Sequence, residues 1–201
     1  MTGNKAVAIG RPRAFDEDKA LGRALEVFWR KGYEGASIAD LTAAMGINPP
    51  SLYAAFGNKE ALFCRALDRY EAEHEASWNE ALSAPTAYEA VKHLLMYSAA
   101  SLGDKRRPPG CLMVQAALCG GKECDAVKKE LDKRRDASFR LIRERLKRAR
   151  REGDLPENTD PASLARYIAT VLHGMAVQAA GGASRKELER VAATALRAWP
   201  E

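Results

Sequence analysis

The sequence predicts an all-α protein of about nine helices, and three observations favour this fold class. Hydrophobic residues make up 46% of the 201 residues and charged residues 29%, which provides for a buried core and excludes a wholly disordered chain. The strong helix formers Ala, Leu, Arg, Glu and Lys dominate. Apolar residues recur at helical spacing, whereas the alternation typical of strands is missing. The breaks between helices predict a three-helix N-terminal domain, residues 15–58, and a larger helical domain, residues 59–201.

Charge and cysteine content limit the class of protein. The formal net charge of +5 permits a polyanionic partner without requiring one. Four cysteines are too few for a disulfide scaffold, and we find no secretory signal, so we expect a cytoplasmic protein. No stretch of about 18 residues is both apolar and uncharged, so we expect no membrane contact.

The sequence lacks the motifs of the common enzyme and metal sites. It contains no Gly-x-Ser-x-Gly, no glycine-rich phosphate loop and no His-Glu-x-x-His. Its three histidines lack metal-ligand spacing, and it has no Cys-x-x-Cys. We therefore expect no enzyme, no metal and no other cofactor.

The first 40 or so residues predict a basic arm followed by a helix. Residues 1–14 lack helical periodicity and contain Arg11 and Arg13 but no acidic residue, so we expect a flexible basic arm. Acidic residues from Asp16 onward favour a helix N-terminus, where the macrodipole stabilises negative charge. We expect Gly32 to end this helix.

Two short helices follow, and the sequence identifies the residues that cap them. Ser37 and Asp40 form a capping-box pattern at the start of the second helix, and Gly46 ends it. Asn48 can cap the third helix, which we expect over Pro49–Ala55. The tight turn between these helices gives the layout of a helix-turn-helix unit.

The third helix has one apolar face and one short, uncharged face. Leu52 and Phe56 are one helical turn apart and should face the core, as should Ile47 in the preceding turn. A slim uncharged helix face fits a DNA major groove, which is about 12 Å wide.

Longer helices fill the rest of the chain. A helix beginning at Lys59 should join the two domains, and the strongest break in the sequence is Asp104–Gly110. The further helices are expected at residues 86–103, 111–120, 124–152, 161–180 and 184–199.

The stretch Gly32–Phe63, GYEGASIADLTAAMGINPPSLYAAFGNKEALF, resembles the DNA-binding signature of the TetR/AcrR family of bacterial transcriptional regulators. The matching elements are Gly32-Tyr33, Ser37-Ile38, Ala39–Leu41 leading to Gly46, Leu52-Tyr53, Phe56-Gly57 and Lys59-Glu60-Ala61-Leu62. The resemblance implies a homodimeric DNA-binding regulator, generally a repressor, that binds a near-palindromic double-stranded operator and is released by an effector. The alternative is a helical dimeric adaptor or sensor that has lost operator binding.

The resemblance also implies which residues contact DNA. Tyr53 matches the phosphate-contacting tyrosine of the family, and Lys59 matches the lysine at the start of the next helix. Ser37 lies at a helix N-terminus, where its hydroxyl and the backbone N–H groups can hold a phosphate. Asn48 and Ser51 match groove-facing positions, so we expect them to read bases. Ala55 departs from the polar residue common in the family, so we expect one contact to be missing there. The complete predicted set is Ser37, Asn48, Pro50, Ser51, Tyr53, Ala54 and Lys59, with Arg11 and Arg13 in the arm.

The densest basic run lies outside this unit. Lys128–Arg151 contains twelve basic and four acidic residues. It is either a second nucleic-acid surface or the solvated face of an amphipathic helix, and a predicted buried stripe favours the second interpretation. That stripe comprises Leu131, Ser138, Leu141, Ile142 and Leu146.

The last two helices are apolar around much of their circumference, which predicts burial on more than one side. The resemblance implies that they form a four-helix homodimer interface, the alternative being an ordinary monomer core. The predicted interface residues are Leu164, Ile168, Val171, Leu172, Met175, Leu188, Val191, Ala195 and Trp199.

An effector site is predicted in the central helices, with core packing as the alternative for each of its residues. The candidates are Cys111, His93, Met96, Tyr97, Met113, Gln115, Tyr167 and His173. Cys111 follows Arg106 and Arg107 and starts a helix, and both the guanidinium charges and the helix dipole would favour its thiolate. Relatives with a similar Gly-Cys-Leu segment respond to electrophiles or oxidants, so the effector is either a small molecule or an electrophile. Cys119 and Cys124 could pair with Cys111 or with each other.

Overall fold

The computed structural model describes residues 15–116 and 124–200, and within these ranges the chain forms nine helices and no strand. This confirms the predicted fold class. The helices are α1 (Glu17–Gly35), α2 (Ile38–Met45), α3 (Pro49–Phe56), α4 (Lys59–Leu82), α5 (Ala87–Leu102), α6 (Leu112–Gln115), α7 (Asp125–Glu152), α8 (Pro161–Ala180) and α9 (Arg185–Leu196).

The predicted helix starts of the N-terminal unit are present. Ser37 and Asp40 form the capping box of α2, and the Asn48 side chain accepts a hydrogen bond from the Ser51 backbone N–H. Gly46 adopts a left-handed conformation, with φ 71°, that turns the chain from α2 into α3. The backbone of Gly32 is non-helical, with φ 70°, so the first helical stretch of α1 ends there as expected, and one further turn continues to Gly35.

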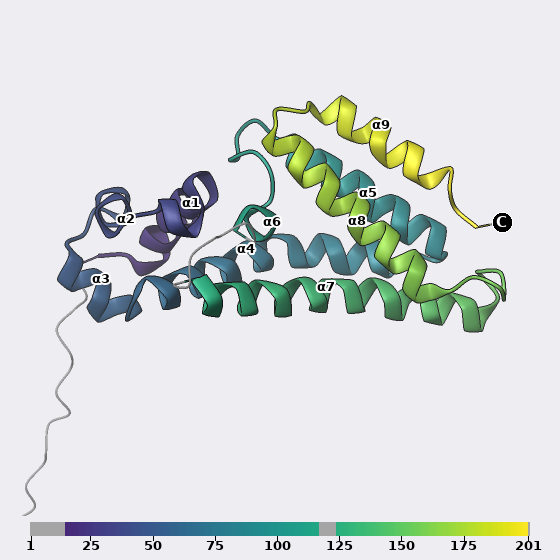
Figure 1. Ribbon diagram of the computed structural model, residues 1–201, viewed down its shortest axis with the longest axis horizontal. Coiled ribbons are helices and arrows are strands. Elements are labelled where there is room, and N and C mark those ends of the chain that lie inside the picture. The colour runs from purple at the N-terminus through teal and green to yellow at the C-terminus, as the bar shows by residue number, and fades with distance from the viewer. Residues whose placement is uncertain (1–14, 117–123, 201) are drawn as a thin grey trace, which may run out of the picture.

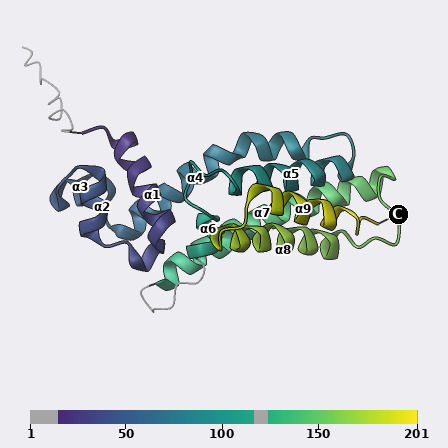
Figure 2. The same ribbon diagram turned by 90° about the horizontal axis from the view of Figure 1, so that it is seen from above.

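A single core joins the N-terminal helices to the larger domain. Phe28, Leu41, Leu52 and Phe63 are buried together, and Leu112 of α6 belongs to the same cluster. Figures 1 and 2 show α1, α2 and α3 at one end of the molecule, with α4 leading from them into the remaining helices and α6 at the junction. The division at residue 58 therefore falls at a packed junction.

The second core lies between α5, α7, α8 and α9. Its buried residues include Leu94, Ile142, Met175 and Leu188. None of the helices in the described parts of the chain is long and apolar enough to span a membrane.

Two expectations for the larger domain are corrected. The helix expected over residues 184–199 ends at Leu196, because the last residues change to turn bonds with carbonyls three positions back. Leu141 is 51% exposed, not part of a buried stripe, because it borders a cavity rather than another helix. Of the helix expected over 111–120, the described part forms a helix at Leu112–Gln115.

Candidate nucleic-acid interface and ligand cavity

Helix α3 presents one face to solvent and one to the core. Leu52 and Phe56 are buried, and Ile47 packs against the same cluster, as predicted. On the outer face Tyr53 is 49% exposed, and Ala54 is exposed beside it. The outer face therefore offers a phenol hydroxyl and apolar surface but no charge.

The N-terminus of α3 is exposed to solvent. Asn48, Pro49 and Pro50 are exposed, and Ser51 is half-buried. The sequence-predicted readout residues Asn48 and Ser51 are hydrogen bonded to each other through the cap, with 2.9 Å between the Ser51 nitrogen and Asn48 Oδ1. The predicted arm residues Arg11 and Arg13 lie outside the described residues.

Ser37 is exposed at the start of α2 and is tied to Asp40. Its hydroxyl donates to Asp40 Oδ2 at 2.7 Å and accepts from the Asp40 backbone N–H at 3.0 Å. Hydrogen bonds from Lys31 and Ser37 hold the pKa of the Asp40 carboxyl at about 2. A DNA phosphate at Ser37 would therefore approach a fixed carboxylate, which limits the contact to the hydroxyl and the helix N-terminus.

Lys59 lies at the first turn of α4, close to α3. Its ammonium group stands over the Tyr33 ring, 4.5 Å from the ring centroid. Nearby, the Arg65 guanidinium stacks on Phe56 and donates to the Ala55 carbonyl. The Ala55 side chain packs against the core, so the unusual alanine at this position is accommodated by packing.

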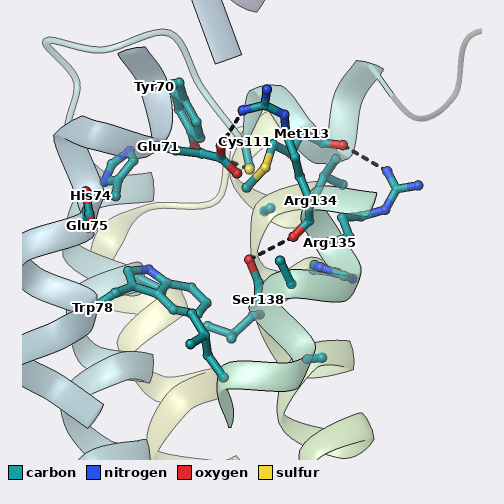
Figure 3. A pocket seen from close by; sticks show the side chains of 18 of the residues that line it. Tyr70, Glu71, His74, Glu75, Trp78, Cys111, Met113, Arg134, Arg135 and Ser138 are labelled. Atoms are coloured by element: carbon teal, nitrogen blue, oxygen red, sulfur yellow. Dashed lines mark hydrogen bonds and ion pairs between the residues drawn. The ribbon is translucent and has the colours of Figure 1, made fainter. Parts of the chain in front are cut away.

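A cavity of about 600 Å³ lies in the larger domain, between α4, α5, α7 and α8, with α6 at one end. Figure 3 shows Cys111 and Tyr70 at one end of it and Trp78 toward the other. Four of the predicted effector residues line it: Tyr97, Cys111, Met113 and His173.

The other four predicted effector residues lie elsewhere. His93 is exposed on α5, and Met96 packs against the second core. Gln115 donates its side-chain amide to the Pro109 carbonyl at 2.9 Å. Tyr167 is exposed on α8, where its hydroxyl lies 3.5 Å from the Ala195 carbonyl. The structure therefore does not bring these residues to the cavity.

Sequence reasoning missed the α4 wall of this cavity. Tyr70, His74 and Trp78 follow one another at intervals of four residues and all line it. This regular spacing on the helix that begins at Lys59 is the signal that could have identified the wall from the sequence. Phe139 of α7 supplies a further aromatic side chain.

The two arginines that line the cavity are both paired with carboxylates. Arg134 forms ion pairs with Asp68, Glu71 and Glu130. Arg135 pairs with Asp132 and donates to the Met113 carbonyl at 3.0 Å. With the arginines paired, the aromatic side chains are the main surface that a molecule in the cavity would contact.

His74 is uncharged in this setting. Burial, with a contribution from the nearby Arg107 charge, lowers the pKa of His74 to about 4. Its Nδ1 lies 2.7 Å from the Tyr97 hydroxyl oxygen. At neutral pH the aromatic wall is therefore without net charge.

Cys111 has a different environment from the one predicted. The Tyr70 hydroxyl donates to its sulfur at 3.3 Å. Arg106 is turned outward, with its side chain 89% exposed and paired with Asp104, and Arg107 pairs with Glu73. Both guanidinium groups are therefore paired with carboxylates rather than with the Cys111 thiol. Helix α6 is too short to supply a sizeable dipole.

The cysteine pairings left open by the sequence are partly resolved. Cys64 and Cys111 are free thiols, so Cys111 pairs with neither of the other two. Cys124 is disulfide-bonded. Cys119 lies outside the described residues.

Several residues of the predicted dimer interface lie inside the subunit. Ile168, Met175, Leu188 and Ala195 are buried in the chain's own core. Leu164, Val171, Leu172 and Trp199 are partly buried against that core, and Trp199 also meets the Tyr88 ring. Val191 remains exposed.

The outer faces of α8 and α9 carry small and apolar residues. On α8 Tyr167, Gly174 and Val177 share one exposed stripe, and Val177 is 54% exposed. On α9 Val191 is exposed, and Ala198 is exposed just beyond the end of the helix. Helices α8 and α9 pack against each other, so these exposed residues lie on neighbouring helices.

Comparison with known proteins decides the family. The model of bacterial regulatory proteins of the tetR family matches residues 20–66, and the model of the tetracyclin repressor-like C-terminal domain matches residues 87–195. This chain belongs to the TetR family. The prediction of a TetR-family DNA-binding transcriptional regulator is thereby confirmed.

Individual TetR-family relatives agree over nearly the whole chain. The transcriptional repressor ComR of Escherichia coli K12 is 36% identical over 196 residues, covering 96% of this chain and 92% of ComR. A cysteine mutant of the regulator CifR, solved in complex with 26-bp double-strand operator DNA, is 51% identical with a TM-score of 0.91, covering 94% of this chain and 100% of CifR. A putative TetR regulator from Rhodococcus sp. RHA1 is 43% identical with a TM-score of 0.63, and the match covers 90% of this chain and 98% of that protein.

Proposed function

We propose that two copies of this chain pair through α8 and α9, bind the two halves of a near-palindromic operator and repress transcription until an effector releases them. The observation that carries the proposal is the outer face of α3, where Tyr53 and Ala54 are exposed beside Lys59 while the opposite face is buried. The names of the relatives ComR and BdcR, both transcriptional repressors of E. coli, support repression over activation.

The α3 face supports a division of roles on DNA. The Tyr53 hydroxyl and the Lys59 ammonium would bind phosphates on either side of the groove, and the Ser37 hydroxyl a third phosphate. Asn48 and Ser51 would meet base edges, while Pro50 and Ala54 would contact thymine methyl groups. Phosphate contacts then supply most of the affinity, and the few polar side chains of α3 supply the sequence preference.

The exposed faces of α8 and α9 support the dimer. A twofold interface is self-complementary, so one surface patch serves both subunits. Tyr167, Val177 and Val191 are the large exposed apolar residues of these two helices among the described residues. Pairing of these faces would place two α3 helices on half-sites roughly 34–36 Å apart or more.

The cavity supports release by a small effector. Its arginines are paired and His74 is neutral, so an uncharged, largely apolar molecule fits it best. The Cys111 sulfur also borders this space, which keeps covalent modification as a second route of release.

Selection of duplexes from a random DNA pool tests the DNA-binding proposal. We expect an enriched inverted repeat, bound with an affinity that falls steeply as salt rises, because phosphate contacts release counterions. Enrichment of no sequence, with binding that salt barely affects, would overturn the proposal in favour of an adaptor.

Alkylation with N-ethylmaleimide tests the thiol route. The Cys111 sulfur would add to one alkene carbon of the maleimide, and the other alkene carbon would take up a proton. We expect the reagent to release the selected duplex from the wild-type protein and from a Cys64→Ser control, whose free thiol lies outside the cavity. An unchanged response in Cys111→Ser would end the thiol route while leaving the small-molecule route intact.

A further inference from the structure

The turn before α6 is the place where the DNA-binding helices meet the rest of the molecule. This turn, which we call the α6 turn, comprises Pro109, Gly110 and Cys111. Gly110 is buried, and the helix that follows contacts α1, α4 and α8. Figure 2 shows α6 beside the junction of α1 and α4, close to one end of α8.

On one side the α6 turn is hydrogen bonded to α1. The Trp29 indole Nε1–H donates to the Gly110 carbonyl at 3.2 Å, and the bond is buried. The Trp29 ring also meets the Tyr70 ring edge-on, with 4.9 Å between the centroids. A buried carbonyl that loses its donor is left without a hydrogen-bond partner, which is unfavourable, so this bond fixes the turn to α1.

On its other side the α6 turn lies directly against α8. A Cβ added at Gly110 would stand 3.2 Å from the Ala176 carbonyl oxygen and 3.0 Å from the Ala180 Cβ. It would also meet the Gln115 side-chain nitrogen at 2.6 Å. Gln115 could turn away by giving up its bond to Pro109, but the backbone of α8 cannot, so the turn itself would have to move.

The α6 turn is also part of the cavity wall. Cys111 lines the cavity and accepts a hydrogen bond from Tyr70, the residue that meets Trp29. Arg135 of the cavity wall holds α6 by donating a hydrogen bond to the Met113 carbonyl. A change in the cavity that moves α6 therefore moves the Gly110 carbonyl relative to the Trp29 indole.

We propose that the hydrogen bond between Trp29 and Gly110 positions the DNA-binding helices relative to α8, and that the α6 turn transmits the state of the cavity to α1 through this bond. Trp29 and Gly110 are positioning residues in this proposal, because neither faces DNA or the cavity. This route rests on the proposed function, and it leads from the cavity to the DNA-binding helices through α1.

Gly110→Ala tests the route without any ligand, and Gly153→Ala is its matched control. Both glycines have a positive φ, 80° and 77°, so an alanine is similarly strained at either position. Only Gly110 has neighbours within 4 Å of the added Cβ. We expect Gly110→Ala to weaken binding to the duplex selected by the wild-type protein about tenfold, and Gly153→Ala to change it less than about twofold.

Trp29→Phe identifies the hydrogen bond as the route. Phenylalanine keeps a ring against Tyr70 but has no N–H donor. In the Trp29→Phe background we expect Gly110→Ala to cost less than about threefold, because the bond it displaces is already absent. An undiminished tenfold loss in that background would overturn the proposal, as would wild-type affinity in Gly110→Ala.

Amide hydrogen exchange separates failure of this inference from failure of the proposed function. We expect faster exchange across α1–α3 in Gly110→Ala than in Gly153→Ala, whether or not any DNA is selected. If Gly110→Ala does not fold, Trp29→Phe alone should show the faster exchange in α1. Exchange indistinguishable from wild type in Trp29→Phe would then refute the positioning role.

Discussion

Three polar side chains start three consecutive helices of the DNA-binding unit. Ser37, Asn48 and Asn58 each accept a backbone hydrogen bond, at 3.0, 2.9 and 2.7 Å respectively. Helices of eight residues are marginal by themselves, so the caps of α2 and α3 and the burial of one face decide whether they form. These starts could be predicted because a cap is a local property of a few adjacent residues.

At the same scale, Lys59→Met tests the assignment of a phosphate contact. We expect the affinity for the selected duplex to fall roughly five- to tenfold at moderate salt, because one charged contact is lost. The slope of log affinity against log salt should shrink by about 1. Titrations at four salt concentrations measure both quantities.

Lys92→Met is the control for this change. Lys92 is exposed on α5, away from α3 (Figure 1). The Lys92→Met change should leave the slope of log affinity against log salt unchanged. Equal slopes for the Lys59 variant and the wild type would remove Lys59 from the interface.

His74 makes the stability of the protein depend on pH. Its pKa is lowered from 6.5 to about 4 in the fold, where it faces Tyr70, Tyr97 and the Arg107 charge. Between these values the unfolded chain takes up a proton that the folded chain does not, so stability rises with pH across this window.

We expect His74→Phe to reduce this dependence. The free energy of unfolding in urea, measured at pH 5 and pH 7, should differ less in the variant than in the wild type. The difference in the wild type should favour pH 7. Identical pH dependence in the two proteins would show that His74 is not held neutral by the fold.

At the scale of elements, α7 shows what an amphipathic pattern does and does not determine. Its buried residues Leu131, Ile142 and Leu146 follow the predicted stripe. Leu141 is exposed instead, because the burial of a helix face depends on which other helices pack against it. The basic face is mostly solvated, but Arg145 is buried and donates to the carbonyls of Leu82, Ala84 and Pro85.

Arg145→Met should therefore destabilise the fold by ~2–4 kcal/mol, because it leaves buried carbonyls without donors at the α4–α5 connection. Arg140→Met, on the exposed side of α7, should change stability by less than ~0.5 kcal/mol. Chemical denaturation of both variants measures the contrast. A loss no larger for Arg145 than for Arg140 would contradict a structural role for this guanidinium.

At the scale of the whole molecule, the cavity is the feature that sequence predicted least completely. Cys111 and Tyr97 could be named as polar groups in apolar helices, but His93 has the same local appearance and faces solvent. Residues from five helices, α4 to α8, line this space, and the rotation of each helix about its axis depends on long-range packing. Local spacing therefore placed some residues correctly and others on the wrong face.

The dimer proposal is tested by adding charge to its face. Val177→Arg should shift the protein from two chains to one in sedimentation and lower DNA affinity at least tenfold, because a single subunit engages only one half-site. Ala76→Arg, which adds the same charge to an exposed position on α4, should do neither. A Val177→Arg protein that remains dimeric would exclude α8 from the interface.

Native mass spectrometry of the protein with its selected duplex tests directly whether two copies each present α3 to one operator. We predict a complex of two chains on one duplex, and a similar duplex with one half-site scrambled should lose most of the affinity. A single chain bound with full affinity, or binding that ignores the scrambled half-site, would contradict the account.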